Sequence, residues 1–409
     1  MNRAWNVVDL FSGAGGMSFG FHSHGAFRVI GAVDKERGKP SSGDGSLECN
    51  STYEANIGLR PMSADVRDLS EGKLREYLQQ TSGTDHVDVL ISCAPCTGFS
   101  RVIRRNLVED DYRNSLVSRS ADFVKMLRPS IFVMENVGEL LEGKFTHHFQ
   151  FLKRELEETG YELSGRVHTL SEFGVPQMRK RALIIAARRP FRLRALERLW
   201  DGFSVNPAAT TVRRAISSLP PLRAGEQCPT DTCHVSPSIE GNTLRRLQLI
   251  PKDGGSWMDT LSSEEGWSLL IPSMRRHAER GKAGPHPDVY GRLAWDRPAA
   301  TIKRECSHTG NGRYAHPDQD RMCTVRELAI LQGFPCDYQF VADSVSNMYR
   351  HVGDAVPPIV SYQIAHVCAW ILSGKRPAIS DVILPKSHLN LDDIVKTPSV
   401  TQLPLLQSA

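Results

Sequence analysis

A cysteine that follows a proline, Cys96, is the residue of this sequence best placed for covalent chemistry. It comes shortly after the apolar run from Val87 to Ile91, which predicts a strand buried in a parallel sheet. Ligands bind beyond the carboxyl ends of the strands in such sheets, so a thiolate there would meet a ligand as a nucleophile. Pro95 fixes the backbone angle just before the thiol. Most cysteines are inert and buried, so the interpretation depends on the residues that accompany Cys96.

Three other predicted strands also end in groups suited to ligand binding. They are Val7 to Leu10, which leads into the glycine turn Phe11-Ser12-Gly13-Ala14-Gly15-Gly16, Val29 to Val33, which ends in Asp34, and Ile131 to Met134, which ends in Glu135 and Asn136. Because the carboxyl ends of parallel strands share one edge of a sheet, all four strands are expected to converge on one crevice.

The glycine turn and Asp34 together indicate a nucleoside ligand. A glycine turn between a strand and a helix lets the backbone approach a ligand closely. The dinucleotide motif G-x-G-x-x-G would need a third glycine where this chain has Ser18, which disfavours a nicotinamide or flavin dinucleotide. Asp34 lies about 20 residues beyond the turn, where a carboxylate can accept hydrogen bonds from ribose hydroxyls. A solvated charge at a strand end is the alternative for Asp34.

Composition is compatible with a nucleic-acid partner without requiring one. The chain has 409 residues, enough for two domains, and a net charge of only +4. Arginines nevertheless gather between residues 188 and 276, as a surface that contacts DNA would require. No charged-then-apolar leader precedes the first strand and no apolar run reaches about 18 residues, so we expect a cytoplasmic protein without a membrane segment.

Two alternative uses of cysteine arise from spacing. Cys93-x-x-Cys96 resembles a redox motif in spacing, although thioredoxin-like sites place such a pair at a helix start. Cys228, Cys233 and His234 could form half of a zinc site, but no second Cys or His pair lies at the usual spacing. The nine cysteines do not suggest a disulfide framework. We therefore expect a reduced protein without metal.

Composition and apolar periodicity divide the chain into four segments. Residues 1–188 alternate apolar strands with amphipathic stretches, which predicts a doubly wound α/β sheet. Residues 189–344 are rich in Pro, Gly, Ser and Thr, which indicates a smaller, irregular second domain. Apolar periodicity returns from Ile359 to Leu372, and the family resemblance described below implies that residues of about 345–376 pack back on the first domain and complete it. Residues 377–409 are expected to form a flexible tail.

Six ordered motifs of this chain resemble those of the cytosine-C5 DNA methyltransferases, and they cover most of its length. They are residues 9–16 as the cofactor loop, Pro95-Cys96 as the nucleophile motif, Glu135-Asn136-Val137, Gln177-Met178-Arg179-Lys180-Arg181, the supporting segment of Arg297 to Ile302 with Thr324 to Glu327 and Leu331 to Pro335, and Gly353 to Pro358.

The resemblance implies a reaction and a role for each matched residue. Cys96 would attack C6 of a flipped-out cytosine, Glu135 would act as an acid near N3, Arg181 would hold the base O2, and Arg179 would organise the site. The Rossmann-like first domain would bind S-adenosylmethionine. Its expected cofactor-binding residues are Phe11, Ser12, Gly13, Ala14, Gly15, Gly16, Asp34, Asp65, Pro95, Asp354 and Ala355.

Double-stranded DNA is the partner that the resemblance implies. The second domain would recognise the target sequence, and the segment Ser100 to Leu116 would close over the DNA. Its expected phosphate contacts are Ser100, Arg101, Arg104, Arg105 and Arg113. A surface loop with a charge cluster is the alternative for this segment. We expect a monomer, with a restriction endonuclease of the same site as a further partner.

Two residues depart from the family pattern. Thr97 stands where many relatives have glutamine, and Asp354 stands where asparagine is usual. Thr97 keeps a hydrogen-bonding group beside the thiol, whereas Asp354 adds a negative charge that could face the cofactor's ammonium group or sulfonium. A tRNA methyltransferase with the same chemistry and a catalytically silent DNA-binding regulator are the competing functions. An intact Cys96 and Glu135 disfavour the second of these.

Overall fold

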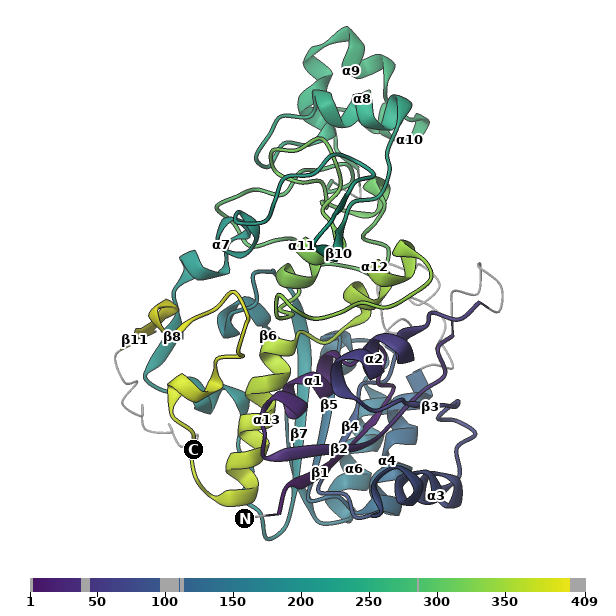
Figure 1. Cartoon of the computed structure of the whole chain (residues 1–409), viewed down its shortest axis with the longest axis vertical. Helices are drawn as coiled ribbons and strands as arrows, with labels where there is room; N and C mark the ends of the chain where they lie inside the picture. The colour runs from purple at the N-terminus through teal and green to yellow at the C-terminus, as the bar shows by residue number, and fades with distance from the viewer. Residues whose placement is uncertain (1–2, 38–44, 96–109, 111–113, 285–286, 398–409) are drawn as a thin grey trace, which may run out of the picture.

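A seven-stranded sheet forms the centre of the lower half of the molecule (Figure 1). The computed structural model describes residues 3–37, 45–95, 110, 114–284 and 287–397. The strands lie in the order β3-β2-β1-β4-β5-β7-β6. Their bounds are Trp5–Leu10 for β1, Phe27–Asp34 for β2, Met62–Ser63 for β3, Val89–Ser92 for β4, Ile131–Asn136 for β5, Tyr161–Thr169 for β6 and Lys180–Arg188 for β7. The four apolar runs of the sequence are therefore confirmed as strands.

Helices cover both faces of this sheet, because alternate residues of its strands are apolar on both sides. Val7 packs on the face covered by α1 and α13, and its neighbour Val8 packs on the face covered by α3, α4 and α6. The bounds are Gly16–Ser23 for α1, Cys49–Ile57 for α2, Glu71–Ser82 for α3, Ser115–Leu127 for α4, Glu139–Glu142 for α5, His147–Glu158 for α6 and Pro358–Ser373 for α13. The expected doubly wound α/β arrangement is confirmed.

The strand order reverses at β1, which lies between β2 and β4 and pairs in parallel with both. The chain continues from the carboxyl end of β1 toward one face of the sheet and from the carboxyl end of β4 toward the other face. A crevice therefore opens between the two strand ends. The glycine turn follows β1 and Pro95 follows β4. The topology therefore brings these two segments together.

The last two strands run against the rest of the sheet. β7 pairs antiparallel with β5, with Asn136 opposite Ala182, and β6 pairs antiparallel with β7. Because β7 is antiparallel, its first residues lie at the edge where β5 ends. Arg181, the second residue of β7, is thereby placed beside Glu135.

The irregular segment forms a second hydrophobic core above the sheet, drawn in teal and green in Figure 1. Trp257 and Leu293 lie in this core, as do Leu328 of the helix at residues 325–331 and Tyr349 of the helix at residues 345–354. Its regular elements are α7 (Val212–Ile216), β9 (Gln227–Cys228), β10 (Asp231–Val235), α8 (Gly241–Leu249), α9 (Glu264–Ser268), α10 (Pro272–Ala278), α11 (Val325–Leu331) and α12 (Val345–Asp354).

The helix α13 lies against α1 (Figure 1). Glycines in α1 allow this close approach: a Cβ on Gly16 would come 2.3 Å from Val356 O, and one on Gly20 would come 2.3 Å from the Ser361 carbonyl carbon and the Tyr362 nitrogen. No single helix in the described part of the chain is long and apolar enough to span a membrane. Taken together, α12 and α13 have the length and composition of a membrane span, but a 41° bend separates them.

The expectation of a flexible tail from residue 377 is wrong for residues 377–397. Val382, Leu384 and Leu389 are buried against the first core, and β11 (Ile394–Lys396) pairs antiparallel with β8 (Phe203–Val205). Trp200 packs in the same core, although it lies beyond the expected boundary at residue 189. Apolar side chains that recur at 382, 384 and 389 give the segment enough buried surface to hold it in place.

Candidate active site

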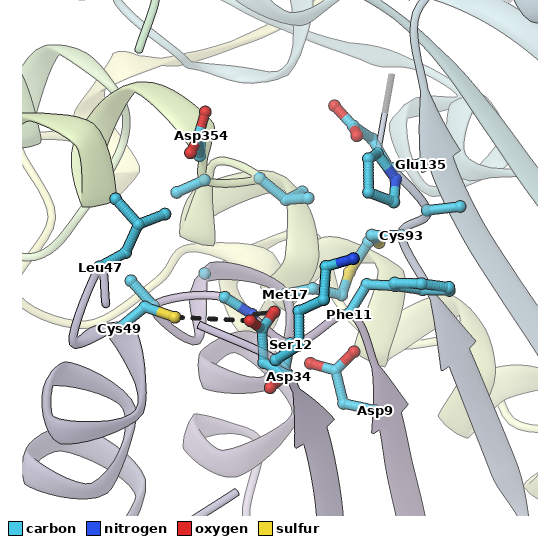
Figure 2. A pocket seen from close by; sticks show the side chains of 18 of the residues that line it. Asp9, Phe11, Ser12, Met17, Asp34, Leu47, Cys49, Cys93, Glu135 and Asp354 are labelled. Carbon is cyan, nitrogen blue, oxygen red and sulfur yellow. Dashed lines mark hydrogen bonds between the residues drawn. The ribbon is translucent and has the colours of Figure 1, made fainter. Parts of the chain in front are cut away.

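A cavity of about 220 Å³ opens at the crevice between β1 and β4 (Figure 2). Its lining comes from the turns after β1 and β4, the ends of β2 and β5, the start of β7 and the segment after α12. The sequence-predicted residues that line it are Phe11, Ser12, Gly13, Ala14, Gly16, Asp34, Asp65, Pro95, Glu135, Arg179, Arg181, Asp354 and Ala355. The structure thus brings together groups that are far apart in the sequence.

The glycine turn after β1 lines the cavity and is held in place by hydrogen bonds of its own backbone N–H groups. Phe11, Gly13 and Gly15 have φ values of 61°, 49° and 89°, so this turn uses the left-handed region repeatedly. The Ser12 N–H donates to Val33 O at 3.1 Å, and the Gly15 N–H donates to Ser12 O at 3.0 Å. Helix α1 begins directly after the turn, so its partially positive end faces the same cavity.

Asp34 binds the turn as well as lining the cavity. Its Oδ2 accepts from the Gly13 N–H at 2.9 Å, and its Oδ1 accepts from the Glu36 N–H at 2.7 Å. The Cys49 thiol donates to Oδ1 at 3.6 Å. The alternative of a solvated charge at a strand end does not fit Asp34, because its carboxylate accepts hydrogen bonds that hold the turn in place.

Asp9 is a buried carboxyl that the sequence analysis did not single out on its own. Its Oδ2 accepts from the Ser18 hydroxyl at 2.6 Å, and Ser18 Oγ accepts from the Tyr53 hydroxyl at 2.7 Å. Burial raises the pKa of Asp9 to about 7, against the hydrogen bond from Ser18, which lowers it. The charge of Asp34 adds to the rise. The cavity floor therefore contains a carboxyl that changes charge near neutral pH.

Asp65 lies at the edge of the cavity between two cations. Arg67 donates to it from Nη2 at 2.7 Å, and Lys35 Nζ donates to its Oδ2 at 3.1 Å. The hydrogen bonds from Arg67, with those from Lys35, hold the pKa of Asp65 well below its usual range. Asp65 is consequently an ionised acceptor, as contact with an exocyclic amine would require.

The turn after β4 is anchored from β5 by Asn136. Its Nδ2 donates to Ala94 O at 3.1 Å, which fixes the backbone directly before Pro95. Cys96 and Thr97 lie outside the described residues. The role of Asn136 in holding this turn was missed by sequence reasoning, although it belongs to the Glu135-Asn136-Val137 motif.

Cys93 has the environment of an inert thiol. Burial raises its pKa well above the usual value, and the charges of Asp9 and Glu135 act in the same direction. A thiol that resists ionisation is a poor redox partner for Cys96. The redox interpretation of Cys93-x-x-Cys96 thus has no support from this environment.

Glu135 and Arg181 form an ion pair over the cavity. Arg181 Nε lies 2.8 Å from Glu135 Oε1, and both side chains are largely buried. Arg181 also donates from Nη1 to Lys180 O at 2.8 Å, which holds the guanidinium in place. Because a buried carboxylate needs a partner, the pairing keeps Glu135 pointing into the site.

Arg179 and Gln177 join the site to the chain segments that support it. Arg179 is buried and donates from Nη1 to Ile302 O at 3.0 Å. Gln177 accepts from the Ile302 N–H at 2.9 Å and donates to Gln332 Oε1 at 2.6 Å. Met178 donates from its backbone to Ala299 O at 2.9 Å. Arg179 and Gln177 thus contact the chain near residue 302, and Gln177 also contacts Gln332, so these motifs meet at one junction.

Asp354 is paired across the cavity margin with an arginine that the sequence analysis did not consider. Arg304 Nε donates to Asp354 Oδ2 at 2.6 Å, and both residues line the cavity. The two groups are partly exposed. The extra negative charge at position 354 is therefore compensated by a positive one within the protein. No motif or spacing pointed to Arg304, which lies 50 residues away.

The expected phosphate contacts are not part of the described structure. Ser100, Arg101, Arg104, Arg105 and Arg113 lie outside the described residues, and only Asp110 and residues 114–116 of that segment are placed. Arginines of the second core are engaged within the chain: Arg213 pairs with Asp296 and Arg245 pairs with Glu265. Neighbouring carboxylates thus offset part of the positive charge that these clustered arginines contribute.

The half zinc site considered from the sequence is not assembled in the described part of the chain. His234 uses both ring nitrogens, on Thr324 Oγ1 at 2.9 Å and on Pro220 O at 2.8 Å. The Cys233 thiol donates to Phe340 O at 3.8 Å. These contacts explain the burial of His234 and Cys233 without a metal ion.

Solved structures with the same architecture define the class of fold. A DNA modification methyltransferase encoded within a prophage of E. coli aligns with a TM-score of 0.61 at 24% identity, covering 90% of this chain and 100% of that one. The Dnmt2 methyltransferase of S. pombe aligns with a TM-score of 0.53 at 17% identity, covering 88% and 97%. The chain has the Rossmann-like α/β fold of a methyltransferase.

Sequence comparison gives the particular family. The family model for C-5 cytosine-specific DNA methylases matches residues 5–370. The Type II methylase M.HgiDII of Herpetosiphon aurantiacus is 30% identical over 372 residues, covering 90% of this chain and 96% of that protein. The Type II methyltransferase M1.HphI of Haemophilus parahaemolyticus is 32% identical, covering 88% and 85%. The chain belongs to the C-5 cytosine-specific DNA methylases and is a DNA (cytosine-5-)-methyltransferase of the restriction-modification type.

Proposed function

We propose that the protein transfers a methyl group from S-adenosylmethionine to C5 of a cytosine flipped out of a specific duplex DNA sequence. The observation that carries the proposal is the Glu135–Arg181 pair, which faces the cavity beside the strand end that leads to Cys96. An acid and a cation at this edge match the needs of a cytosine ring under attack at C6, and Cys96 is the thiol we assign to that attack.

The cavity residues fit S-adenosylmethionine. The glycine turn and Asp34 would hold the ribose, Asp65 the adenine amine, and Asp354 with Arg304 the amino-acid end. Ser12 Oγ and Asp9 Oδ1 are buried and have no hydrogen-bond partner in the described part of the protein, which leaves polar atoms for a ligand. When bound, this cofactor supplies the methyl group on a positively charged sulfonium.

The protein's own groups would activate the base. The Cys96 thiolate forms a bond to C6, and the electrons of the C5–C6 double bond move toward N3, where protonated Glu135 donates a proton. Arg181 would hold O2 and neutralise charge on the ring. C5 is then nucleophilic enough to accept the methyl group. Loss of the C5 proton to a base, departure of the thiolate from C6 and return of the N3 proton to Glu135 would restore the aromatic ring.

The target base must leave the duplex to reach this site, and the irregular second core is the part available to read sequence. Within residues 189–344 we assign the second core, which begins at Val212, to target recognition, and we assign the segment from Ser100 to Leu116 to phosphate contacts. A restriction endonuclease acting on the same site would be the functional partner of a monomeric enzyme. We place the reaction in the cytoplasm, at the nucleoid, because the duplex DNA of bacteria, the source of both relatives, lies there.

Incubation of the purified protein with S-adenosylmethionine and mixed-sequence DNA tests this proposal. The product DNA, sequenced for 5-methylcytosine, should carry the mark in one short sequence context. Transfer RNA in a parallel reaction should remain unmodified. Methylation of the RNA alone, or of no nucleic acid at all, would contradict the proposed substrate.

A further inference from the structure

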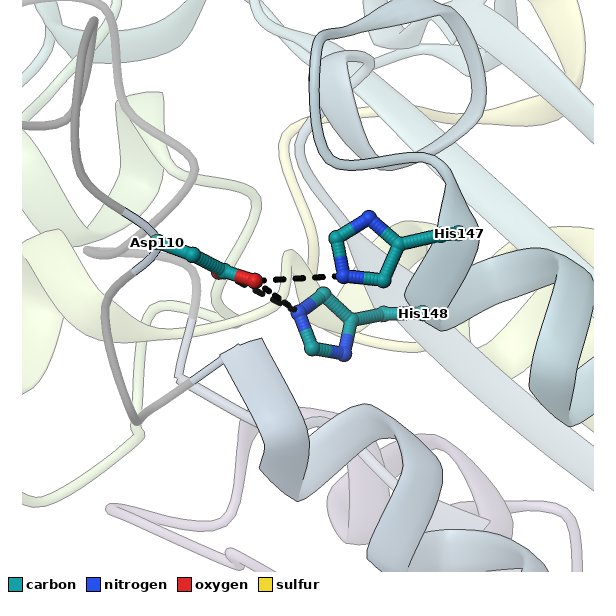
Figure 3. A group of neighbouring side chains, drawn as sticks. All are labelled: Asp110, His147 and His148. Atoms are coloured by element: carbon teal, nitrogen blue, oxygen red, sulfur yellow. Dashed lines mark hydrogen bonds and ion pairs between the residues drawn. The ribbon is translucent and has the colours of Figure 1, made fainter.

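Outside the active site, two histidines at the start of α6 converge on one carboxylate (Figure 3). His147 Nε2 lies 3.1 Å from Asp110 Oδ2, and His148 Nε2 lies 2.9 Å from the same oxygen. The three donor atoms lie within 4.8 Å of one another. The reaction derived above makes no use of these side chains.

The spacing of these atoms is close to that of a metal site. Zinc bonds to imidazole nitrogen and carboxylate oxygen are about 2.0 to 2.2 Å long, so tetrahedral ligand atoms lie about 3.3 Å apart. The observed separations of 3.1 and 2.9 Å from Asp110 Oδ2 are a few tenths of an ångström shorter. A small outward rotation of the side chains would therefore admit an ion.

Neighbouring side chains orient two of the three groups. Asn114 Nδ2 donates to Asp110 Oδ1 at 2.7 Å, and His148 Nε2 lies 3.2 Å from this oxygen, farther than from Oδ2. Oδ2 is the oxygen that both rings contact. His148 Nδ1 lies 3.4 Å from Ser118 Oγ, so the nitrogen that faces away from Asp110 has a hydrogen-bonding partner. Ligating histidines usually have such a partner on the second nitrogen, because it fixes the ring and the tautomer.

We propose that Asp110, His147 and His148 form a binding site for a transition-metal dication such as Zn²⁺. Two imidazoles and one carboxylate form a ligand set that such ions favour, and partial exposure of the cluster leaves the remaining position to water. The ion would link Asp110, which precedes α4, to the first turn of α6. It would act apart from the methyl-transfer chemistry.

Calorimetric titration of the chelator-treated full-length protein with Zn²⁺ at about pH 7.5 tests this site. One equivalent should bind the wild type, and the affinity should fall by about tenfold or more in His147→Ala, His148→Ala and Asp110→Asn. His86→Ala is the matched control, because His86 is also an exposed histidine paired with an aspartate, Asp88, at 3.0 Å. This variant should bind like the wild type.

Thiols also bind zinc, so the titration is repeated with Cys336→Ser, which removes an exposed thiol. The histidine-dependent equivalent should remain. Thermal unfolding of each variant without metal checks that it is folded, and added Zn²⁺ should raise the Tm of the wild type more than that of His148→Ala. Absence of binding to the wild type, or equal binding by all three cluster variants, would overturn the proposal.

Discussion

Arg181 Nε lies 2.8 Å from Glu135 Oε1, although the two residues sit on strands that run in opposite directions. The antiparallel pairing of β5 with β7 is what brings the start of one strand to the end of the other. The side chains of Glu135 and Arg181, to which we assign roles on one substrate ring, thus share a single edge of the sheet.

Glu135→Gln should lower the rate of methyl transfer by about 10²- to 10⁴-fold, because the amide cannot donate the proton that stabilises the ring. Cofactor affinity should stay within about twofold of the wild type. Glu142→Gln, an exposed glutamate on the neighbouring α5, is the control and should be fully active. Single-turnover kinetics check both, and a fully active Glu135→Gln protein would contradict the assigned role.

Asp34→Ala should weaken S-adenosylmethionine binding by about 1 to 3 kcal/mol, since hydrogen bonds of a charged group are lost. Asp34→Asn should lose less, because the amide oxygen can still accept from the Gly13 N–H. Calorimetry measures both affinities, with DNA binding in the absence of cofactor as the control. Unchanged cofactor affinity in Asp34→Ala would remove Asp34 from the site.

Arg304→Gln should weaken S-adenosylmethionine binding by about three- to tenfold, because the guanidinium at this partly exposed position would face the cofactor's carboxylate. Binding of 5′-methylthioadenosine, which lacks the amino-acid end, should be unchanged. The comparison of the two ligands separates a direct contact from a structural effect. Equal losses for both would mean that the Arg304–Asp354 pair only supports the fold.

The buried Asp9 predicts a pH dependence of stability. Its pKa is about 7 in the folded protein, above its usual value of 3.8, so the folded state holds a proton that the unfolded state releases first. This contribution is fully present below about pH 4 and is lost as the pH rises through about 7. The free energy of unfolding should therefore fall over that window by up to about 1.4 kcal/mol per pH unit from this group.

Asp9→Asn keeps an acceptor for Ser18 and removes the titration, so its unfolding free energy should vary less with pH between 4 and 7. Denaturant unfolding at a series of pH values compares the two proteins. Identical pH profiles would show that Asp9 is ionised throughout this range.

Sequence reasoning found the strands and the groups at their ends, because buried parallel strands leave long apolar runs that stop at polar residues. The placement of Arg181 beside Glu135 came only from the motif, since nothing local shows that β7 is antiparallel. Arg304 was missed because its partner, Asp354, is distant in the sequence and depends on how the second core packs. The tail was misjudged because its prolines outweighed three apolar residues that are buried against the first core.

Trapping the covalent intermediate tests the central claim most directly. With 5-fluorocytosine at the target position, Cys96 can add to C6 and the methyl group can transfer, but release would require expulsion of fluorine as a cation. The protein–DNA adduct should survive denaturing electrophoresis, only when S-adenosylmethionine is present, in the wild type and in Cys93→Ala. Cys96→Ala should form none, and a denaturation-resistant adduct in that protein would show that another residue is the nucleophile.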